Sequence, residues 1–294
     1  MEVTTMTLRT IRKAAHMPRE PRAPGFAVAQ LHPDRIGGGF DPFLQIDAFA
    51  LSEPVFKPHP HAGFSAVTYI LPESPIGFIN RDSLGGRIRI PPGALHWTIA
   101  GGGLHHEEVP ERRGVAALGL QMFIDLPASM RHMAPGWLHL DPADAPRTQA
   151  DGADVRVVLG ASSGARSPLS PPTPGVFLID VKLEAGATFA QDIEPAVNAF
   201  VYMLDGTTTG APALSAFDLA GFNRDGDRIE LRAGPDGARF ILLGGTPLDQ
   251  PVASRGPFVM SSEAELDRVF SDYRAGRLGH LDPNSYGPDG APVL

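Results

Sequence analysis

The sequence predicts an all-β protein made of two related units, and three observations support this class. The 294 residues include 33 glycines and 30 prolines, which divide a chain into short segments and favour strands over long helices. Short apolar segments rich in β-branched and aromatic residues recur between turn motifs such as LDGT, NRDGD and GPDG. The segment VTYILPE at 67–73 is similar to FVYMLDG at 200–206, and this weak repeat indicates two units that meet near residues 126–140.

Eight segments are predicted as strands, and each is short and bounded by Gly, Pro, Asp or Asn. In chain order they are residues 26–31, 65–71, 114–125, 155–159, 176–183, 198–204, 228–231 and 238–243. The Pro-, Ser- and Gly-rich stretch 162–175 is predicted to be an exposed loop.

One short helix is predicted near the C-terminal end. Ser262 followed by Glu265 forms a capping-box pattern, and Gly276 is suited to end the helix. Between these positions apolar side chains recur at helical spacing: Leu266, Val269, Phe270 and Tyr273.

Composition excludes several classes of function. The net charge of −8 and the pI of about 5.7 argue against direct nucleic-acid binding, which normally needs a basic face. Cysteine is absent, so any metal must be held by histidine and carboxylate ligands. The first residues lack the apolar region of a signal peptide, and no apolar run is long enough to span a membrane. We therefore expect a cytoplasmic protein.

The ten histidines avoid residues 140–279, so a histidine-based metal site is expected in the first half of the chain. In an extended HPH segment, His59 and His61 point to the same face and could reach one ion. The pattern fits equally a turn with two solvated histidines. Aligned on the internal repeat, these two positions correspond to Asp192 and Glu194, so the second half cannot build the same site.

The stretch GGGLHHEEVP at 101–110 contains four ionisable side chains in a row. If it is a strand, His106 and Glu108 face one way, whereas His105 and Glu107 face the other. Together with the HPH pair this makes a set of three imidazoles and one carboxylate, which suits Fe, Mn, Ni, Cu or Zn. The alternative is a polar edge strand whose charges pair weakly in water.

A further histidine, His96 in PPGALHW (91–97), is a second possible source of the third imidazole. Turns separate it from the GGGLHHEEVP stretch, so the alternation of side chains along a strand does not choose between His96 and the histidines of that stretch.

The ordered motifs DPFLQID (41–47), HPHAGF (59–64), NRDSLGG (80–86), PPGALHW (91–97) and AGGGLHHEEVP (100–110) resemble the pirin family of the cupin superfamily. In the second half, FVYMLDG (200–206), LLGGTPLDQPV (242–252) and GPFVMSSEAEL (256–266) resemble the C-terminal segments of pirins. The resemblance covers nearly the whole chain.

This resemblance implies a bicupin, with a metal-binding antiparallel β-barrel at residues 1–132 and a barrel without metal at 133–294, which includes the short helix. It implies one mononuclear iron site with His59, His61, His106 and Glu108 as ligands. The chain departs from the usual pirin pattern at two positions. His96 stands where pirins commonly have glutamine, and Ser65 stands where they often have glutamate.

The resemblance also implies an activity. Some family members are quercetin 2,3-dioxygenases, so we expect an Fe(II)-dependent dioxygenase in which Glu108 accepts a proton from a small aromatic substrate. The alternative is a metal-dependent regulatory protein that binds a transcription factor or a metabolic enzyme. Candidates for the apolar lining of the expected cavity are Phe43, Phe64, Trp97 and Met122. Each of them taken singly is more often an ordinary core residue than a substrate contact.

Overall fold

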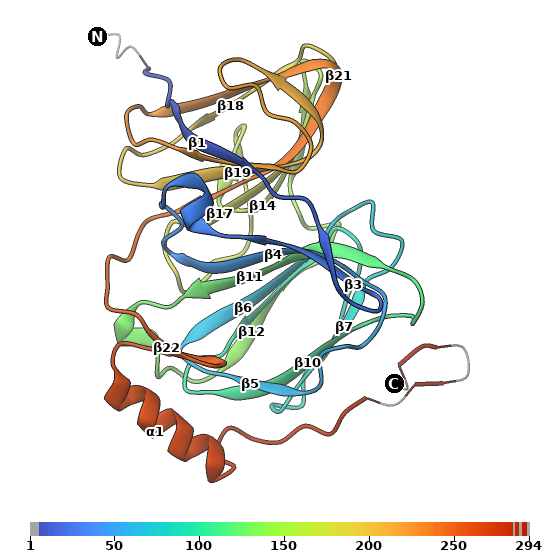
Figure 1. The fold of residues 1–294 in the computed structure, drawn as a ribbon, viewed down its shortest axis with the longest axis vertical. Coiled ribbons are helices and arrows are strands. Elements are labelled where there is room, and N and C mark those ends of the chain that lie inside the picture. Colours follow the sequence, from blue (N-terminus) through green and yellow to red (C-terminus); the bar gives the residue numbers. More distant parts are fainter. Residues whose placement is uncertain (1–5, 285, 288–289, 293–294) are drawn as a thin grey trace. The chain divides into compact units, whose positions relative to one another are not determined.

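The computed structural model describes residues 6–284, 286–287 and 290–292. The chain divides into two compact units that interleave along the sequence (Figure 1). Of the described residues, unit 1 contains 6–18, 31–42 and 143–247, and unit 2 contains 19–30, 43–142 and those from 248 onwards. The domain boundary after residue 132 stays a prediction.

Unit 2 contains a seven-stranded sheet in which neighbouring strands pair antiparallel. Its spatial order is β12 (Gly136–Leu140), β9 (Leu95–Ile99), β6 (Phe64–Ile70), β11 (Ala117–Asp125), β4 (Phe43–Leu51), β3 (Phe26–Leu31) and β2 (Glu20–Ala23). A second sheet of the same unit has the order β5 (His59–His61), β10 (Leu104–Pro110), β7 (Phe78–Asp82) and β8 (Arg87–Ile90).

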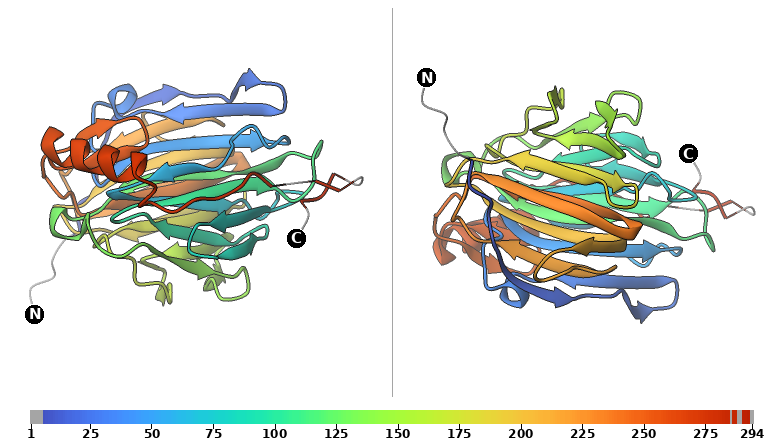
Figure 2. Two further views of the ribbon diagram at one scale, coloured as in Figure 1. Left: turned by 90° about the horizontal axis from the view of Figure 1, so that it is seen from below. Right: turned by 90° about the horizontal axis from the view of Figure 1, so that it is seen from above.

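The C-terminal part of unit 2 begins with the hairpin β22 (Ala253–Arg255) and β23 (Phe258–Met260), followed by helix α1 (Glu263–Arg274). Leu266 and Val269 of α1 pack with Phe258 against Ala62, next to β5. Figure 2 shows the helix against the outside of the strands of unit 2. Ser262 caps the helix by accepting a hydrogen bond from the Glu265 amide, as the sequence predicts.

Unit 1 is also built from antiparallel strands. Its order is β1 (Ile11–His16), β20 (Asp218–Phe222), β19 (Asn198–Thr209), β21 (Arg228–Gly245), β17 (Phe177–Leu183), β14 (Ala153–Leu159) and β13 (Arg147–Ala150), and β18 (Thr188–Asp192) also pairs with β21. The buried side chains between these strands are apolar and include Val157, Phe189, Met203 and Phe240.

The weak sequence repeat has a structural counterpart. Its two segments form β6 and β19, and each is the third strand in its sheet order. In unit 2 the register pairs His106 with His59. In unit 1, Asp192, which the repeat aligns with His59, lies opposite Arg228, and these side chains form an ion pair at 2.7 Å.

The predicted all-β class and the single C-terminal helix are confirmed for the described residues. Among the described residues, the first and last strands of each sheet order are not paired with each other, so closure into barrels stays a prediction. The separate strands predicted at 228–231 and 238–243 are wrong. They form one strand, β21, because both sides of the GPDG segment pair with β19 and the expected turn becomes an irregularity in the ladder.

The exposed loop predicted at 162–175 is partly replaced by a small hairpin of β15 (Ala161–Ser162) and β16 (Ala165–Arg166). Two short 3-10 helices complete the described elements, η1 (Pro33–Ile36) and η2 (Ala128–Met130). Within the described residues, no helix has the length and apolar character needed to cross a membrane.

Candidate metal centre

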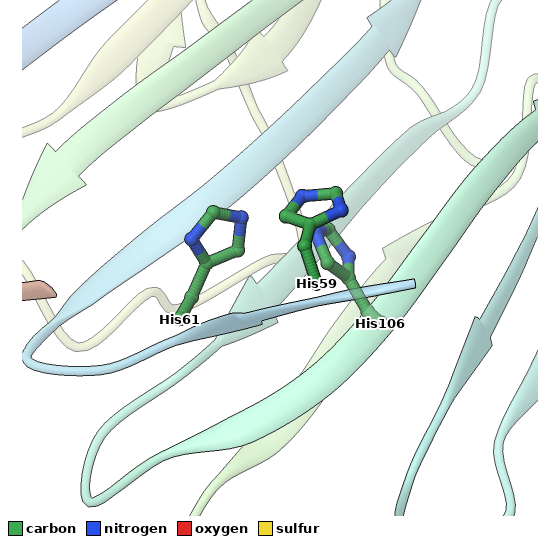
Figure 3. A group of neighbouring side chains, drawn as sticks. All are labelled: His59, His61 and His106. Carbon is green, nitrogen blue, oxygen red and sulfur yellow. The ribbon is translucent and has the colours of Figure 1, made fainter. Parts of the chain in front are cut away.

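Three histidines from two adjacent strands converge on one point (Figure 3). His59 and His61 lie on β5, and His106 lies directly opposite His59 on β10. One ring nitrogen from each residue lies within 4.8 Å of the corresponding nitrogens of the other two. The ring centroids are 4.7 to 4.9 Å apart. The structure therefore brings together the three imidazoles that the sequence indicated.

Hydrogen bonds orient two of these rings. The Nδ1 atom of His59 lies 2.8 Å from the carbonyl oxygen of Lys57, and Nδ1 of His61 lies 3.4 Å from that of Pro257. A carbonyl oxygen only accepts, so each Nδ1 carries the proton and Nε2 is left to bind an ion. Nδ1 of His106 is buried and has no hydrogen-bond partner among the described residues.

Burial keeps the three imidazoles neutral, which is the form that binds metals. Desolvation lowers the pKa of His61 to about 3, and the neighbouring His59 adds to this effect. The pKa of His106 lies well below its usual value for the same reasons, and burial also lowers the pKa of His59. Nitrogens about 2.1 Å from a shared ion lie at most about 4.2 Å apart, so only small ring movements separate this arrangement from a bound one. The residues present therefore fit a divalent metal ion.

Glu108 points to the same side of β10 as His106 and is 9% exposed. Its two carboxyl oxygens lie 2.8 and 2.7 Å from the hydroxyl oxygen of Thr68, and Gln121 Oε1 lies 2.7 Å from the same hydroxyl. One hydroxyl has one proton, so either Glu108 is protonated or the Gln121 amide turns its nitrogen to Thr68. Desolvation raises the pKa of Glu108 to about 7. The carboxyl group thus lines the same cavity as the histidines and is held by Thr68 of β6, but it is not part of the group whose ligand atoms lie within 4.8 Å of one another.

The three histidines and Glu108 line a cavity of about 190 Å³. The remaining wall consists of Phe26, Gln45, Asp47, Phe49, Leu51, Phe56, Phe78, Gln121 and Phe123. Most of these side chains are apolar, and Phe56, 45% exposed, marks the opening to the surface. Aromatic walls with few polar groups are typical of sites for small planar molecules.

The four candidates for the apolar lining are ordinary core residues, which is the more frequent alternative for each of them taken singly. Phe43, Phe64, Trp97 and Met122 are buried but do not contact the cavity. Met122 lies between Gln121 and Phe123, which face the cavity, so strand alternation turns it to the other face. Phe64 packs beneath the site instead, with ring centroids 5.0 Å from His61 and 4.8 Å from Phe123.

The other two residues of the HHEE segment hold the C-terminal segment on the outside of β10. Glu107 pairs with Arg81 at 2.5 Å and accepts a hydrogen bond from the Asn284 amide at 3.1 Å. The Nδ1 atom of His105 lies 3.3 Å from the Leu278 carbonyl oxygen. Successive side chains of β10 therefore alternate between the cavity on one face and the C-terminal segment of the same chain on the other.

Replacing Glu107 with alanine is expected to release the segment 278–284. The loss of a buried hydrogen bond to a charged group costs about 1.5–3 kcal/mol, so the Asn284 amide should exchange with solvent at least about tenfold faster. Hydrogen exchange followed by mass spectrometry measures this change. The matched control is Glu20→Ala, which removes a carboxylate that is 65% exposed, and equal exchange in both variants would contradict the role of Glu107.

His96 lies outside the histidine cluster. It is fully buried on β9, and its ring centroid is 5.6 Å from that of His139 on β12. Neither ring nitrogen has a hydrogen-bond partner within the part of the chain that the structure describes. Desolvation, with a smaller effect of His139, lowers the pKa of His96 to about 3.

This burial predicts a pH dependence of stability. Below the unfolded pKa of 6.5 the unfolded chain protonates His96 and the folded protein does not, so stability falls as the pH drops from 6.5 towards 3. In His96→Gln the free energy of unfolding should fall less steeply, by up to about 1.4 kcal/mol per pH unit. At pH 5 this amounts to a total difference of about 2 kcal/mol. Urea unfolding of the metal-free protein across this range tests it. His32→Gln, at an exposed site, should leave the slope unchanged, and an unchanged slope in His96→Gln would refute the prediction.

Some residues around the cavity carried no separate signal in the sequence. Thr68, Gln121 and Asp47 lie side by side on β6, β11 and β4, in a row that contacts Glu108 through Thr68. Asn80 lies opposite Glu108 on β7 and is fully buried, with neither side-chain polar atom bonded to a described residue. Each is a polar residue among apolar neighbours of a strand, and this pattern is the signal that could have indicated the row.

Two antiparallel β units, one with a histidine cluster in a cavity between its sheets, define a two-domain member of the cupin superfamily. The family model "Pirin" matches residues 26–124, and the model "Pirin C-terminal cupin domain" matches residues 178–279. The chain belongs to the pirin family.

Individual proteins agree with this assignment. The chain is 35% identical over 250 residues to pirin-like protein 2 of Arabidopsis thaliana, covering 81% of this chain and 76% of the relative. It is 32% identical over 245 residues to mouse (Mus musculus) pirin, covering 81% and 83%. A crystal structure of quercetin 2,3-dioxygenase from Acinetobacter baumannii is similar with a TM-score of 0.81 and 25% identity, covering 93% of this chain and 99% of that one.

Proposed function

We propose that the protein is an Fe(II)-dependent dioxygenase that cleaves a flavonol-type substrate, such as quercetin. The observation that carries this proposal is the group of three neutral imidazoles beside a buried carboxyl group in an aromatic cavity. The similarity to the quercetin 2,3-dioxygenase of Acinetobacter baumannii supports it independently.

In this proposal His59, His61 and His106 hold the ion through their ring nitrogens, with Glu108 as the fourth ligand. Such a ligand set suits Fe(II), and also Mn, Ni, Cu or Zn. A bound ion supplies Lewis acidity and, in the case of iron, redox chemistry with dioxygen. The hydrogen bonds from His59 to Lys57 and from His61 to Pro257 preorganise two of the rings.

The remaining chemistry belongs to side chains of the cavity wall. Glu108 accepts the proton of a substrate hydroxyl group when its carboxyl group is hydrogen-bonded to Thr68, and it would hold the ion when turned away from Thr68. Phe49, Phe78 and Phe123 pack against the flat faces of the substrate and exclude water. A flavonol would extend past Phe56 towards the surface, because the cavity itself measures about 190 Å³.

Anaerobic reconstitution with Fe(II), followed by addition of quercetin and oxygen, tests the activity. We expect oxygen uptake coupled to loss of quercetin, and little of either with Glu108→Gln. A fully metal-loaded protein that consumes neither quercetin nor oxygen would contradict the proposal.

A second candidate function is a metal-dependent regulatory protein that binds a transcription factor or a metabolic enzyme. The observation that favours it is that β10 carries His106 on one face and, through Glu107, holds the C-terminal segment on the other. Metal binding on one face would then change the stability of a surface segment. Metal-dependent capture of a partner that is lost in Glu107→Ala would support this function.

A further inference from the structure

The polar groups of the cavity wall are concentrated on the β4 side, away from the histidines. Gln121 of β11 stands next to Asp47 of β4 in the sheet register, and Gln45 follows on the same face of β4. The other wall residues of β3 and β4 are apolar: Phe26, Phe49 and Leu51. Asp47 is thus the one acidic side chain that β3, β4 and β11 contribute to the cavity wall.

Only one of the two carboxylate oxygens of Asp47 has a hydrogen-bond donor among the described residues. Its Oδ2 atom accepts a hydrogen bond from Gln45 Nε2 at 2.8 Å. Its Oδ1 atom is buried and has no hydrogen-bond partner among the residues that the structure describes. A buried acceptor without a partner costs free energy, and burial also raises the pKa of Asp47, so the carboxylate gains from any donor placed beside Oδ1.

The sheet register sets the separation between Asp47 and Thr68, the residue that contacts Glu108. Thr68, which contacts Glu108, lies on β6, and Asp47 lies two strands away across β11. Strands are spaced about 4.8 Å apart, so the two residues are separated by about 10 Å across the sheet. This is comparable to the length of a small molecule of two or three linked rings.

We propose that Asp47 determines the substrate specificity of the cavity, because its carboxylate accepts a hydrogen bond from a hydroxyl group at the end of an aromatic ligand opposite the chelating oxygen. The preferred ligands are planar aromatics with a chelating oxygen at one end and a phenolic hydroxyl at the other. The inference rests on the proposed function for the orientation of the ligand. It adds which members of the substrate class the protein prefers.

Binding of two flavonols to the Fe(II)-loaded protein under anaerobic conditions tests this inference without turnover. The probes are quercetin and galangin, which is the same flavonol without the two hydroxyl groups on its pendant ring. A hydrogen bond to a charged acceptor corresponds to a preference of about tenfold or more, so the unmodified protein should bind quercetin at least about tenfold more tightly. Asp47→Leu should reduce this preference to below about twofold, with the affinity for galangin nearly unchanged.

Gln45→Leu is the matched control, because it removes the neighbour of Oδ2 and leaves Oδ1 in place, and it should retain the preference. Equal binding of the two flavonols by the unmodified protein, an unchanged preference in Asp47→Leu, or no binding of either flavonol would each overturn the inference. Selective binding without oxygen uptake would leave the role of Asp47 intact and remove the dioxygenase activity. Turnover of quercetin without a binding preference over galangin would support the dioxygenase activity and contradict the role of Asp47.

Discussion

Replacing His106 with alanine is expected to abolish stoichiometric binding of a divalent metal. His106 is the member of the cluster that β10 contributes, and its ring lies between 4.8 and 4.9 Å from those of His59 and His61. Two imidazoles on β5 would remain, and the loss of one of three protein nitrogens should lower the affinity by at least about a hundredfold, judged from the 10–100-fold effect of supporting residues alone. Metal content after reconstitution and desalting measures the effect.

His96→Ala is the control for this experiment. His96 is as deeply buried as His106 but packs near His139, outside the cluster. This variant should retain about one metal ion per chain. Loss of metal in His96→Ala together with retention in His106→Ala would show that the ligand set has been assigned to the wrong histidine.

Replacing Arg131 with leucine is expected to produce the largest loss of stability. Arg131 is fully buried and donates to Asp125 at 2.7 Å, to the Pro251 carbonyl oxygen and to Ser261 Oγ. Removing one partner of a buried ion pair leaves an uncompensated charge, which costs about 3–5 kcal/mol. The same contacts hold the segment 251–261, which includes the Pro257 carbonyl that orients His61, so metal affinity should also fall.

Urea unfolding of the metal-free protein measures the loss of stability, and metal titration measures the loss of metal affinity. Arg89→Leu provides a control in the same unit, because its pair with Glu111 lies on the surface with Arg89 61% exposed. Surface pairs contribute at most about 1 kcal/mol. A similarly small loss of stability in both variants would show that the hydrogen bonds of Arg131 do not hold the segment 251–261 in place.

The central part of the site could be predicted because it follows from local geometry. Residues two apart on a strand share a face, so the HPH segment and the pair His106 and Glu108 each presented their side chains together. The helix was predictable for a similar reason, since Ser262 and Glu265 form a cap within one turn. The resemblance to pirins then chose between His106 and His96, and the structure places His106 in the cluster.

The rest of the site depends on contacts between distant parts of the chain. The row from Thr68 to Asp47 exists because β6, β11 and β4 are neighbours in the sheet, and no local pattern specifies that register. Which face of β11 meets the cavity also depends on the sheet, and this is why Met122 was assigned to the lining in place of Phe123. One partner of Glu107 is Asn284, far along the chain, in a segment without regular structure.

The most direct test of the account is a crystal structure of the metal-reconstituted protein with anomalous diffraction at the absorption edge of the metal. We predict one strong anomalous peak about 2.1 Å from the nitrogens of His59, His61 and His106, with an oxygen of Glu108 turned from Thr68 towards it. A fully loaded protein whose peak lies beside His96 and His139, or away from all of these histidines, would contradict the account.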